Sequence, residues 1–154
     1  AATRPKPPLK EIVMEIAGYN MPEDLYYDQY HFWTRVDGDE LVIGMDDFAE
    51  KLAGQIVFVQ LPFVGKAVTA GKKFAKVESG KWLGTVYSPA DGEITAVNEE
   101  LEANPTLINA DCYGKGWMYR IKPADISQIN SLIHGGKDVR EAWLQEDIKK
   151  FKKD

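Results

Sequence analysis

The chain has 154 residues and a net charge of −5, with 19 Lys and Arg against 24 Asp and Glu. Hydrophobic residues make up 44% and charged residues 28%, as in a soluble globular protein. The acidic balance argues against nucleic acid as the main partner, the single cysteine, Cys112, excludes an internal disulfide, and the apolar runs are too short to cross a membrane. We therefore expect a cytoplasmic protein with no nucleic-acid or membrane partner.

Residues 1–24 are predicted to form an N-terminal arm and a short helix. Residues 1–8 are rich in proline and basic side chains. Gly18 then ends a pattern of apolar residues at helical spacing, formed by Leu9, Ile12, Val13, Ile16 and Ala17. The spacing predicts a helix over residues 9–17, which must pack on the rest of the chain to persist.

Residues 25–123 are predicted to form a β-domain. Segments rich in β-branched and aromatic residues alternate with turn signals such as Asp37-Gly38 and Ser88-Pro89. The strands are expected over residues 26–36, 40–44, 55–61, 74–78, 85–87, 93–97 and 117–121. A helix of one or two turns is expected over residues 46–52, and residues 98–116 are rich in loop signals.

A weak internal repeat runs through this β-domain. The segment from Gly54 to Val59 resembles that from Gly92 to Val97, and Val68-x-x-Gly71 resembles Leu101-x-x-Asn104. Asn in the place of Gly is suited to a left-handed turn position. The repeat predicts two pseudo-symmetric β-halves with the region of Lys81 at their junction. The alternative is that both copies are ordinary strand–turn patterns.

Residues 124–154 are predicted to form C-terminal helices packed on or beside the β-domain. The first helix has apolar residues at helical spacing and is broken by Gly135-Gly136. The second presents Leu144, Ile148 and Phe151 on one face and ends in lysines, which favour the negative end of a helix dipole.

The sequence offers little for catalysis. The two histidines, His31 and His134, lack metal-ligand spacing and are interpreted as a packed side chain and a helix-end cation. A nucleophile elbow and a phosphate-binding P-loop are both absent, and nothing near Cys112 marks it as a reactive thiol. We predict no catalytic residue and no metal site, and hence that the chain is not an enzyme.

One segment has the pattern of a modification site. In Val77-Glu-Ser-Gly-Lys81-Trp, a lysine follows a strand inside a tight turn, and another strand follows within a few residues. A hairpin tip projects its lysine into solvent, where a modifying enzyme can reach the amine. The alternative is an ordinary surface lysine.

Many short pieces between about Tyr30 and Pro123 are together similar to one family. These pieces are His31-Phe-Trp33, Gly44, Asp47-Phe-Ala49, residues 52–62, Val64-Gly65, Ala70-Gly71, Val77-Glu-Ser79, Tyr87-Ser-Pro89, Gly92-Glu, Val97-Asn-Glu99, Asn104-Pro105, Leu107-Ile-Asn109 and residues 113–117. In this order they resemble the glycine-cleavage H-protein family of lipoyl carriers. The resemblance implies a mainly β, lipoyl/biotinyl-type barrel-sandwich hybrid with short flanking helices.

The same resemblance implies a site. Lipoate is expected in amide linkage to Lys81, with Glu78, Gly65 and Gly92 used in recognition by the lipoylating enzyme. Ser79, Gly80 and Trp82 are the implied neighbours of the arm.

The chain departs from the family where the site lies. The usual motif is Glu-Ser-Val-Lys-Ala, but Gly80 precedes Lys81 here and Trp82 follows it. Gly80 permits a positive φ that valine disfavours. The N-terminal extension, the segment over residues 21–27 and the C-terminal helix also exceed what we expect of a typical member. These departures resemble the H-like lipoate-binding proteins that serve a heterodisulfide-reductase-like complex in sulfur oxidation.

The expected function is therefore a swinging-arm lipoyl carrier, with sulfur intermediates as its main predicted cargo. The alternative is a glycine cleavage H-protein that carries aminomethyl groups and electrons. An alternative of another class is a β-sandwich interaction module with Lys81 unmodified. A biotin carrier is disfavoured because the Ala-Met-Lys-Met motif is absent.

The resemblance also implies partners. These are a lipoate ligase or lipoyl assembly enzymes, the heterodisulfide-reductase-like complex or the glycine cleavage enzymes, and an oxidoreductase of the dihydrolipoamide dehydrogenase type. Such a carrier positions the cofactor, which supplies the thiol–disulfide chemistry.

Overall fold

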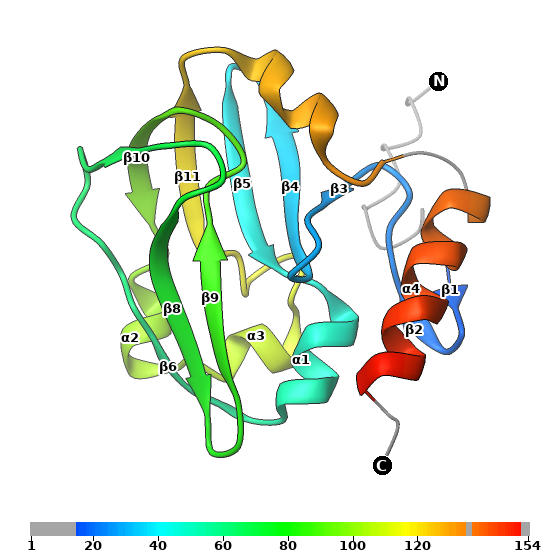
Figure 1. Ribbon diagram of the computed structural model, residues 1–154. Coiled ribbons are helices and arrows are strands. Elements are labelled where there is room, and N and C mark those ends of the chain that lie inside the picture. The colour runs from blue at the N-terminus through cyan, green and yellow to red at the C-terminus, as the bar shows by residue number, and fades with distance from the viewer. Residues whose placement is uncertain (1–14, 135–136, 152–154) are drawn as a thin grey trace, which may run out of the picture.

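The computed structural model describes residues 15–134 and 137–151 (Figure 1). Two sheets form most of the molecule. The six-stranded sheet has the order β3-β4-β5-β11-β10-β7, with β3 (Tyr26–Tyr27), β4 (Phe32–Asp37), β5 (Glu40–Met45), β11 (Tyr119–Pro123), β10 (Gly92–Val97) and β7 (Ala67–Val68). The three-stranded sheet has the order β6-β8-β9, with β6 (Ile56–Val59), β8 (Lys73–Ser79) and β9 (Leu83–Tyr87).

The two sheets enclose the main hydrophobic core. Side chains of β5, β10 and β11 meet those of β6, β8 and β9 in one buried cluster, which includes Ile43, Ile121, Val59, Val77 and Val86. Figure 1 shows β8 and β9 lying in front of the larger sheet. This is the mainly β, sandwich-like fold with short helices that the sequence predicts.

The helix α1 (Asp47–Ala53) follows β5 and covers one end of the sandwich. Asp46 caps its start, because its side chain accepts a hydrogen bond from the Ala49 N–H at 2.8 Å. Gly54 ends it with φ 78° and ψ −155°, a conformation that only glycine adopts readily. The short helix predicted over residues 46–52 is therefore confirmed.

Residues 98–116, predicted as loops, contain two single-turn helices, α2 (Glu100–Ala103) and α3 (Leu107–Ala110). The two copies of the proposed repeat both form strands, β6 and β10, but in different sheets. Asn104 has φ −139°, so the expectation that it replaces glycine in a left-handed turn is wrong. It ends α2 instead, where its N–H donates to the Glu100 carbonyl.

The helix predicted over residues 9–17 is wrong for its described part. Glu15–Ile16 (β1) and Tyr19–Asn20 (β2) form a small hairpin, and residues 9–14 lie outside the described residues. Its two turn residues, Ala17 and Gly18, have φ 52° and 89°, as a two-residue hairpin turn requires. The hairpin buries Ile16 and Tyr19 in a second core cluster.

The C-terminal region is helical, as predicted. A 3₁₀ helix, η2 (Ile126–Ser131), follows β11, and α4 (Lys137–Phe151) packs Leu144 into the second core cluster beside β1 and β2. Across residues 15–134 and 137–151, every helix is too short or too polar to span a membrane.

Candidate functional site

Lys81 lies at the tip of the β8–β9 hairpin and is exposed. Glu78 pairs with Leu83, so four residues, 79–82, form the connection. The Ser79 N–H donates to the Trp82 carbonyl at 2.8 Å, and the Lys81 N–H donates to Ser79 Oγ at 3.3 Å. The turn is thus closed by its own hydrogen bonds, and the lysine projects from a fixed base.

The stem of Lys81 lies over the C-terminal cap of α1. A Cβ on Gly54 would stand 3.5 Å from Lys81 Cε and 4.0 Å from Nζ. Asn109 of α3 holds this cap in place, because its Nδ2 donates to the Gly54 carbonyl at 2.8 Å and its Oδ1 accepts the Ile56 N–H at 2.9 Å. The negative end of the α1 dipole favours a cation at this position.

Trp82 packs down onto the hairpin. A methyl group at position 84 would overlap its ring, so Gly84 provides the space in which the ring lies. The half-buried ring also contacts the main core. Gly80 has no atom within 4 Å of its would-be Cβ and is not among the residues of positive φ. The expectation that the turn uses the positive-φ freedom of Gly80 is therefore wrong.

Glu78 lies in the middle of a row across the three-stranded sheet. It pairs with Phe58 on one side and with Leu83 on the other. Its carboxylate is half-exposed and stands 3.5 Å from the ammonium of Lys76. The surface close to the Lys81 turn therefore presents an acidic group flanked by exposed apolar side chains.

A cavity of about 250 Å³ lies between the hairpin and the helices. Its lining comprises residues 29–32, Phe48, Ala49 and Leu52 of α1, residues 82–85 and Tyr87 of the hairpin, and Phe151 of α4. None of these described residues carries a carboxylate. A larger hollow of about 620 Å³ shares Gln29, Tyr30 and Tyr87 with it but includes none of residues 79–82. The smaller cavity is therefore the one that reaches the Lys81 turn, through Trp82.

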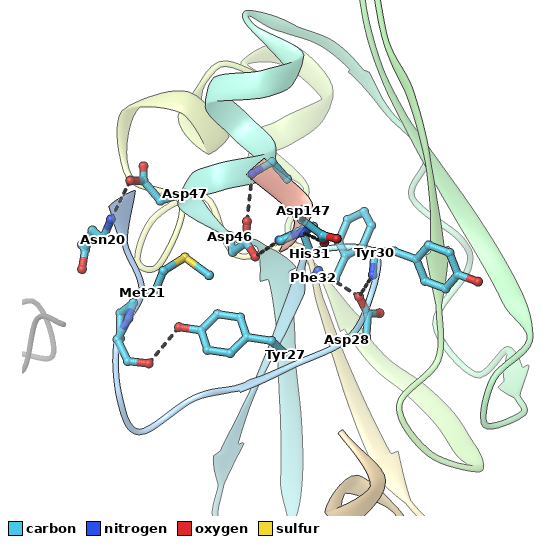
Figure 2. Close-up of polar contacts among 12 residues, drawn as sticks. Asn20, Met21, Tyr27, Asp28, Tyr30, His31, Phe32, Asp46, Asp47 and Asp147 are labelled. Atoms are coloured by element: carbon cyan, nitrogen blue, oxygen red, sulfur yellow. Dashed lines mark hydrogen bonds and ion pairs between the residues drawn. The ribbon is translucent and has the colours of Figure 1, made fainter. Parts of the chain in front are cut away.

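His31, which the sequence marks only as a packed side chain, is the most unusual residue of this cavity. It is buried, with φ 71°, and both ring nitrogens face carboxylates: Nδ1 lies 2.8 Å from Asp46 and Nε2 lies 2.6 Å from Asp147 (Figure 2). Burial lowers its pKa, but the two carboxylates outweigh burial and raise it to about 9. The ring is an imidazolium at neutral pH.

Asp28 shapes the loop before β4. Its Oδ1 accepts the N–H groups of Tyr30 and Phe32 at 2.9 and 3.1 Å, and Figure 2 shows Tyr30 pointing toward the hairpin. Burial raises the pKa of Asp28 to about 6, although these hydrogen bonds oppose the shift. The loop therefore carries a carboxyl group that titrates near pH 6.

Two of the predicted recognition residues lie away from Lys81. Gly92 begins β10, beyond the far end of β9, and pairs with Val68. The N–H of Gly65, whose φ is 98°, donates to the Ile94 carbonyl of the same strand. Both glycines meet backbone requirements there, and their part in recognition stays a prediction.

The remaining candidates have packing roles. His134 stacks on Tyr26, with ring centroids 4.0 Å apart. Cys112 is buried, and burial raises the pKa of its thiol well above the ordinary range. Within residues 15–134 and 137–151, no group of three or more His, Cys, Asp or Glu side chains could hold a metal ion.

Two facing sheets with an exposed lysine at one hairpin tip define a lipoyl-type barrel-sandwich carrier. The family model for the glycine cleavage H-protein matches residues 25–146, and the chain belongs to this family. Members of the family are lipoyl carrier proteins.

Individual relatives agree with this assignment. A glycine cleavage system H protein of Anoxybacillus flavithermus is 45% identical over 114 residues, which cover 74% of this chain and 90% of that protein. One of Thermus thermophilus is 40% identical over 117 residues, covering 76% and 91%. The crystal structure of a glycine cleavage system H protein from Mycobacterium marinum matches with a TM-score of 0.70 and 31% identity, covering 82% of this chain and 98% of that one.

The extent of the match corrects one expectation. The family model reaches residue 146, well inside α4. The C-terminal helix is therefore largely a family feature rather than an addition to it.

Proposed function

We propose that this chain carries lipoate in amide linkage to Lys81 and moves aminomethyl groups and electrons among the glycine cleavage enzymes. The supporting observation is an exposed lysine on a self-closed hairpin tip, with Glu78 beside it and a cavity next to it. The names of the relatives support the pathway.

The residues around Lys81 fit an acylated lysine. The amine is exposed, and its stem crosses a glycine, so the side chain can leave the α1 cap without displacing another side chain. When attached, lipoate supplies a dithiol–disulfide couple that can accept a group or electrons. The hairpin supplies a fixed anchor, and the tether raises the local concentration of that group at each docked partner.

Three kinds of partner follow from this role. A lipoate ligase or lipoyl assembly enzymes would acylate Lys81, with Glu78 as a recognition residue. Glycine cleavage enzymes would load and unload the arm, and an oxidoreductase of the dihydrolipoamide dehydrogenase type would reoxidise it. Each must approach the same hairpin tip, where Glu78 offers a charge that a basic surface can pair with.

Peptide mass mapping after treatment with a lipoate ligase tests the attachment. We expect the lipoyl mass on the Lys81 peptide alone, its complete loss in Lys81→Arg, and unchanged modification in Lys76→Arg, a matched change on the exposed face of β8. Modification elsewhere with Lys81 bare would overturn the site. An intact mass that never changes would favour the interaction module.

A second cargo, sulfur intermediates delivered to a heterodisulfide-reductase-like complex, is favoured by one observation. The described residues that line the cavity near the hairpin carry no carboxylate, and the imidazolium of His31 is balanced by Asp46 and Asp147 behind it. An ammonium group is costly to bury without a carboxylate partner. A neutral sulfur species fits such walls better.

Rates of cargo transfer discriminate the two. Lipoylated protein is offered to the purified glycine cleavage enzymes and, separately, to a heterodisulfide-reductase-like complex with a sulfur donor. Turnover only with the former supports the primary proposal. Turnover only with the latter would replace it, while attachment to Lys81 would stand.

A further inference from the structure

The helix α4 is attached to the rest of the protein at two places of unequal strength. Near its start, the buried guanidinium of Arg140 donates to backbone carbonyls of the segment before β3, those of Met21, Pro22, Glu23 and Leu25. The same group lies over the ring of Tyr27, 5.1 Å from its centroid. This half of the helix is firmly held.

Near its end, α4 is held by an ion pair. Asp147 Oδ2 lies 2.6 Å from His31 Nε2, while Asp46 Oδ2 lies 2.8 Å from His31 Nδ1 (Figure 2). Ionised carboxylates only accept hydrogen bonds, so both ring nitrogens must donate, and only the imidazolium can do so. The pairing of His31 with Asp147 therefore depends on one proton on the ring.

The turn that follows Asp147 forms part of the cavity wall. Phe151 lies one turn further along the helix and lines the cavity beside Trp82. Its ring centroid stands 6.3 Å from that of Phe48, and it remains about half exposed. Lys149 and Lys150, which lie between Asp147 and Phe151, are exposed. Besides the His31 pair and these edge contacts, the last turn is held by Ile148, which is partly buried against the second core cluster.

We propose that the last turn of α4 is a movable wall of the cavity beside Lys81, latched by His31 between Asp46 and Asp147 while Arg140 retains the rest of the helix. Releasing the latch opens the cavity and exposes whatever the Lys81 arm has placed in it. The role toward the arm rests on the function proposed above, whereas the latch does not.

The charges around His31 keep the latch closed at neutral pH. Asp46 faces it from the start of α1, Asp147 faces it from α4, and Asp28 lies near it in the loop before β4. The ring stacks on Trp143, with centroids 4.6 Å apart. With a folded pKa of about 9 against roughly 6.5 unfolded, the free energy that the His31 pairs contribute to stability is fully present below pH 6.5 and is lost as pH rises through 9.

Hydrogen exchange on the full, unmodified chain tests the latch. In Asp147→Asn we expect the protection factors of residues 148–151 to fall about tenfold, while those around Arg140 stay unchanged. Glu146→Gln, the same charge change on an exposed neighbour, should leave both regions unchanged. In the wild type, raising the pH from 7 to 10 should reproduce the loss, and in Asp147→Asn it should add nothing.

Equal loss of protection along the whole of α4, or no loss at all, would overturn the latch. A second measurement, on lipoylated protein, tests whether the last turn of α4 covers the arm. Asp147→Asn and Phe151→Ala, which removes the wall without touching His31, should both speed the reaction of the reduced arm with a soluble disulfide several-fold. An unchanged rate in both variants would overturn the wall. A chain never lipoylated on Lys81 would refute the proposed function alone, because the exchange result needs no lipoate.

Discussion

The side chain of Lys81 crosses Gly54 closely enough that a Cβ at position 54 would stand 3.5 Å from Lys81 Cε. The position of the proposed modification site thus depends on the way α1 ends, through residues 27 positions apart in the chain. Asn109 fixes that end from α3. Three segments therefore set the resting place of one lysine.

Gly54→Ala should lower the free energy of unfolding by about 1–3 kcal/mol, because φ 78° with ψ −155° is strained for any residue with a Cβ. Urea denaturation measures the loss. Gly80→Ala is the control, and it should change stability by less than about 0.5 kcal/mol, since its Cβ meets nothing within 4 Å. Equal losses in the two variants would contradict the role of the Gly54 backbone.

Trp82→Ala should destabilise the fold by about 1–2 kcal/mol, less than the loss of a fully buried tryptophan, because the ring is only half buried over Gly84. Leu83→Ala, at a side chain that is 63% exposed, should cost far less. Thermal or urea unfolding gives both values. If Trp82→Ala keeps its stability and its reduced arm reacts faster with a soluble disulfide, the ring shields the arm. Weakened partner docking alone would make it an interface residue.

Cys112 should resist thiol reagents in the folded protein. Burial raises the pKa of its thiol, so little thiolate is present and the reagent cannot reach it. Labelling with a maleimide at pH 8 should follow the rate of unfolding as urea is added. The introduced thiol of Gly80→Cys, at an exposed turn, should react at once. Comparable rates for the two thiols without urea would contradict the buried position.

Asp28→Asn should stabilise the protein in a pH-dependent way. The folded pKa of about 6 lies above the unfolded value of about 3.8, so wild-type stability falls as pH rises from 4 to 6. Asparagine keeps an oxygen for the Tyr30 and Phe32 N–H groups and removes the charge. The gain should be near zero at pH 4 and reach about 1–3 kcal/mol above pH 6.

Urea unfolding at several pH values measures this difference. Asp125→Asn is the control, because hydrogen bonds from Ser127 lower the pKa of that exposed carboxyl. It should show no gain over the same range. A gain for Asp28→Asn that is already complete at pH 4 would show that charge burial is not its cause.

Hairpins were the part of the fold most readable from the sequence. Asp37-Gly38 and the Ser79–Trp82 turn each lie between β-prone runs, and local turn chemistry decides such pairings. Residues 15–20 form a hairpin where the apolar spacing predicts the end of a helix, because two strands around a tight turn bury Ile16 and Tyr19 as a helix face would. The local sequence does not distinguish the helix from the hairpin, since the β1–β2 hairpin is held by packing against α4.

The candidate site likewise has one part that the sequence predicts and one part that it does not. Lys81, Glu78 and Trp82 are contiguous in sequence, so their proximity was predictable. His31 and Asp147 are separated by 116 positions, and their pairing requires α4 to fold back over the start of β4. The sequence shows no metal-ligand or catalytic spacing around His31 that would mark it as part of a site. Its left-handed backbone, φ 71°, is likewise invisible in the residue type.

Strand β8 pairs along both of its edges, with β6 on one side and β9 on the other. A strand that is hydrogen-bonded on both sides cannot bend independently of its sheet, so the backbone below Lys81 keeps a fixed position relative to that sheet. The reach of a group attached to Lys81 would then be set by the rotatable bonds of that group and of the lysine side chain. Under the proposed function, every partner enzyme must then place its reactive centre at one shared distance from residue 81, and lengthening the turn by a residue would change that distance for all of them together.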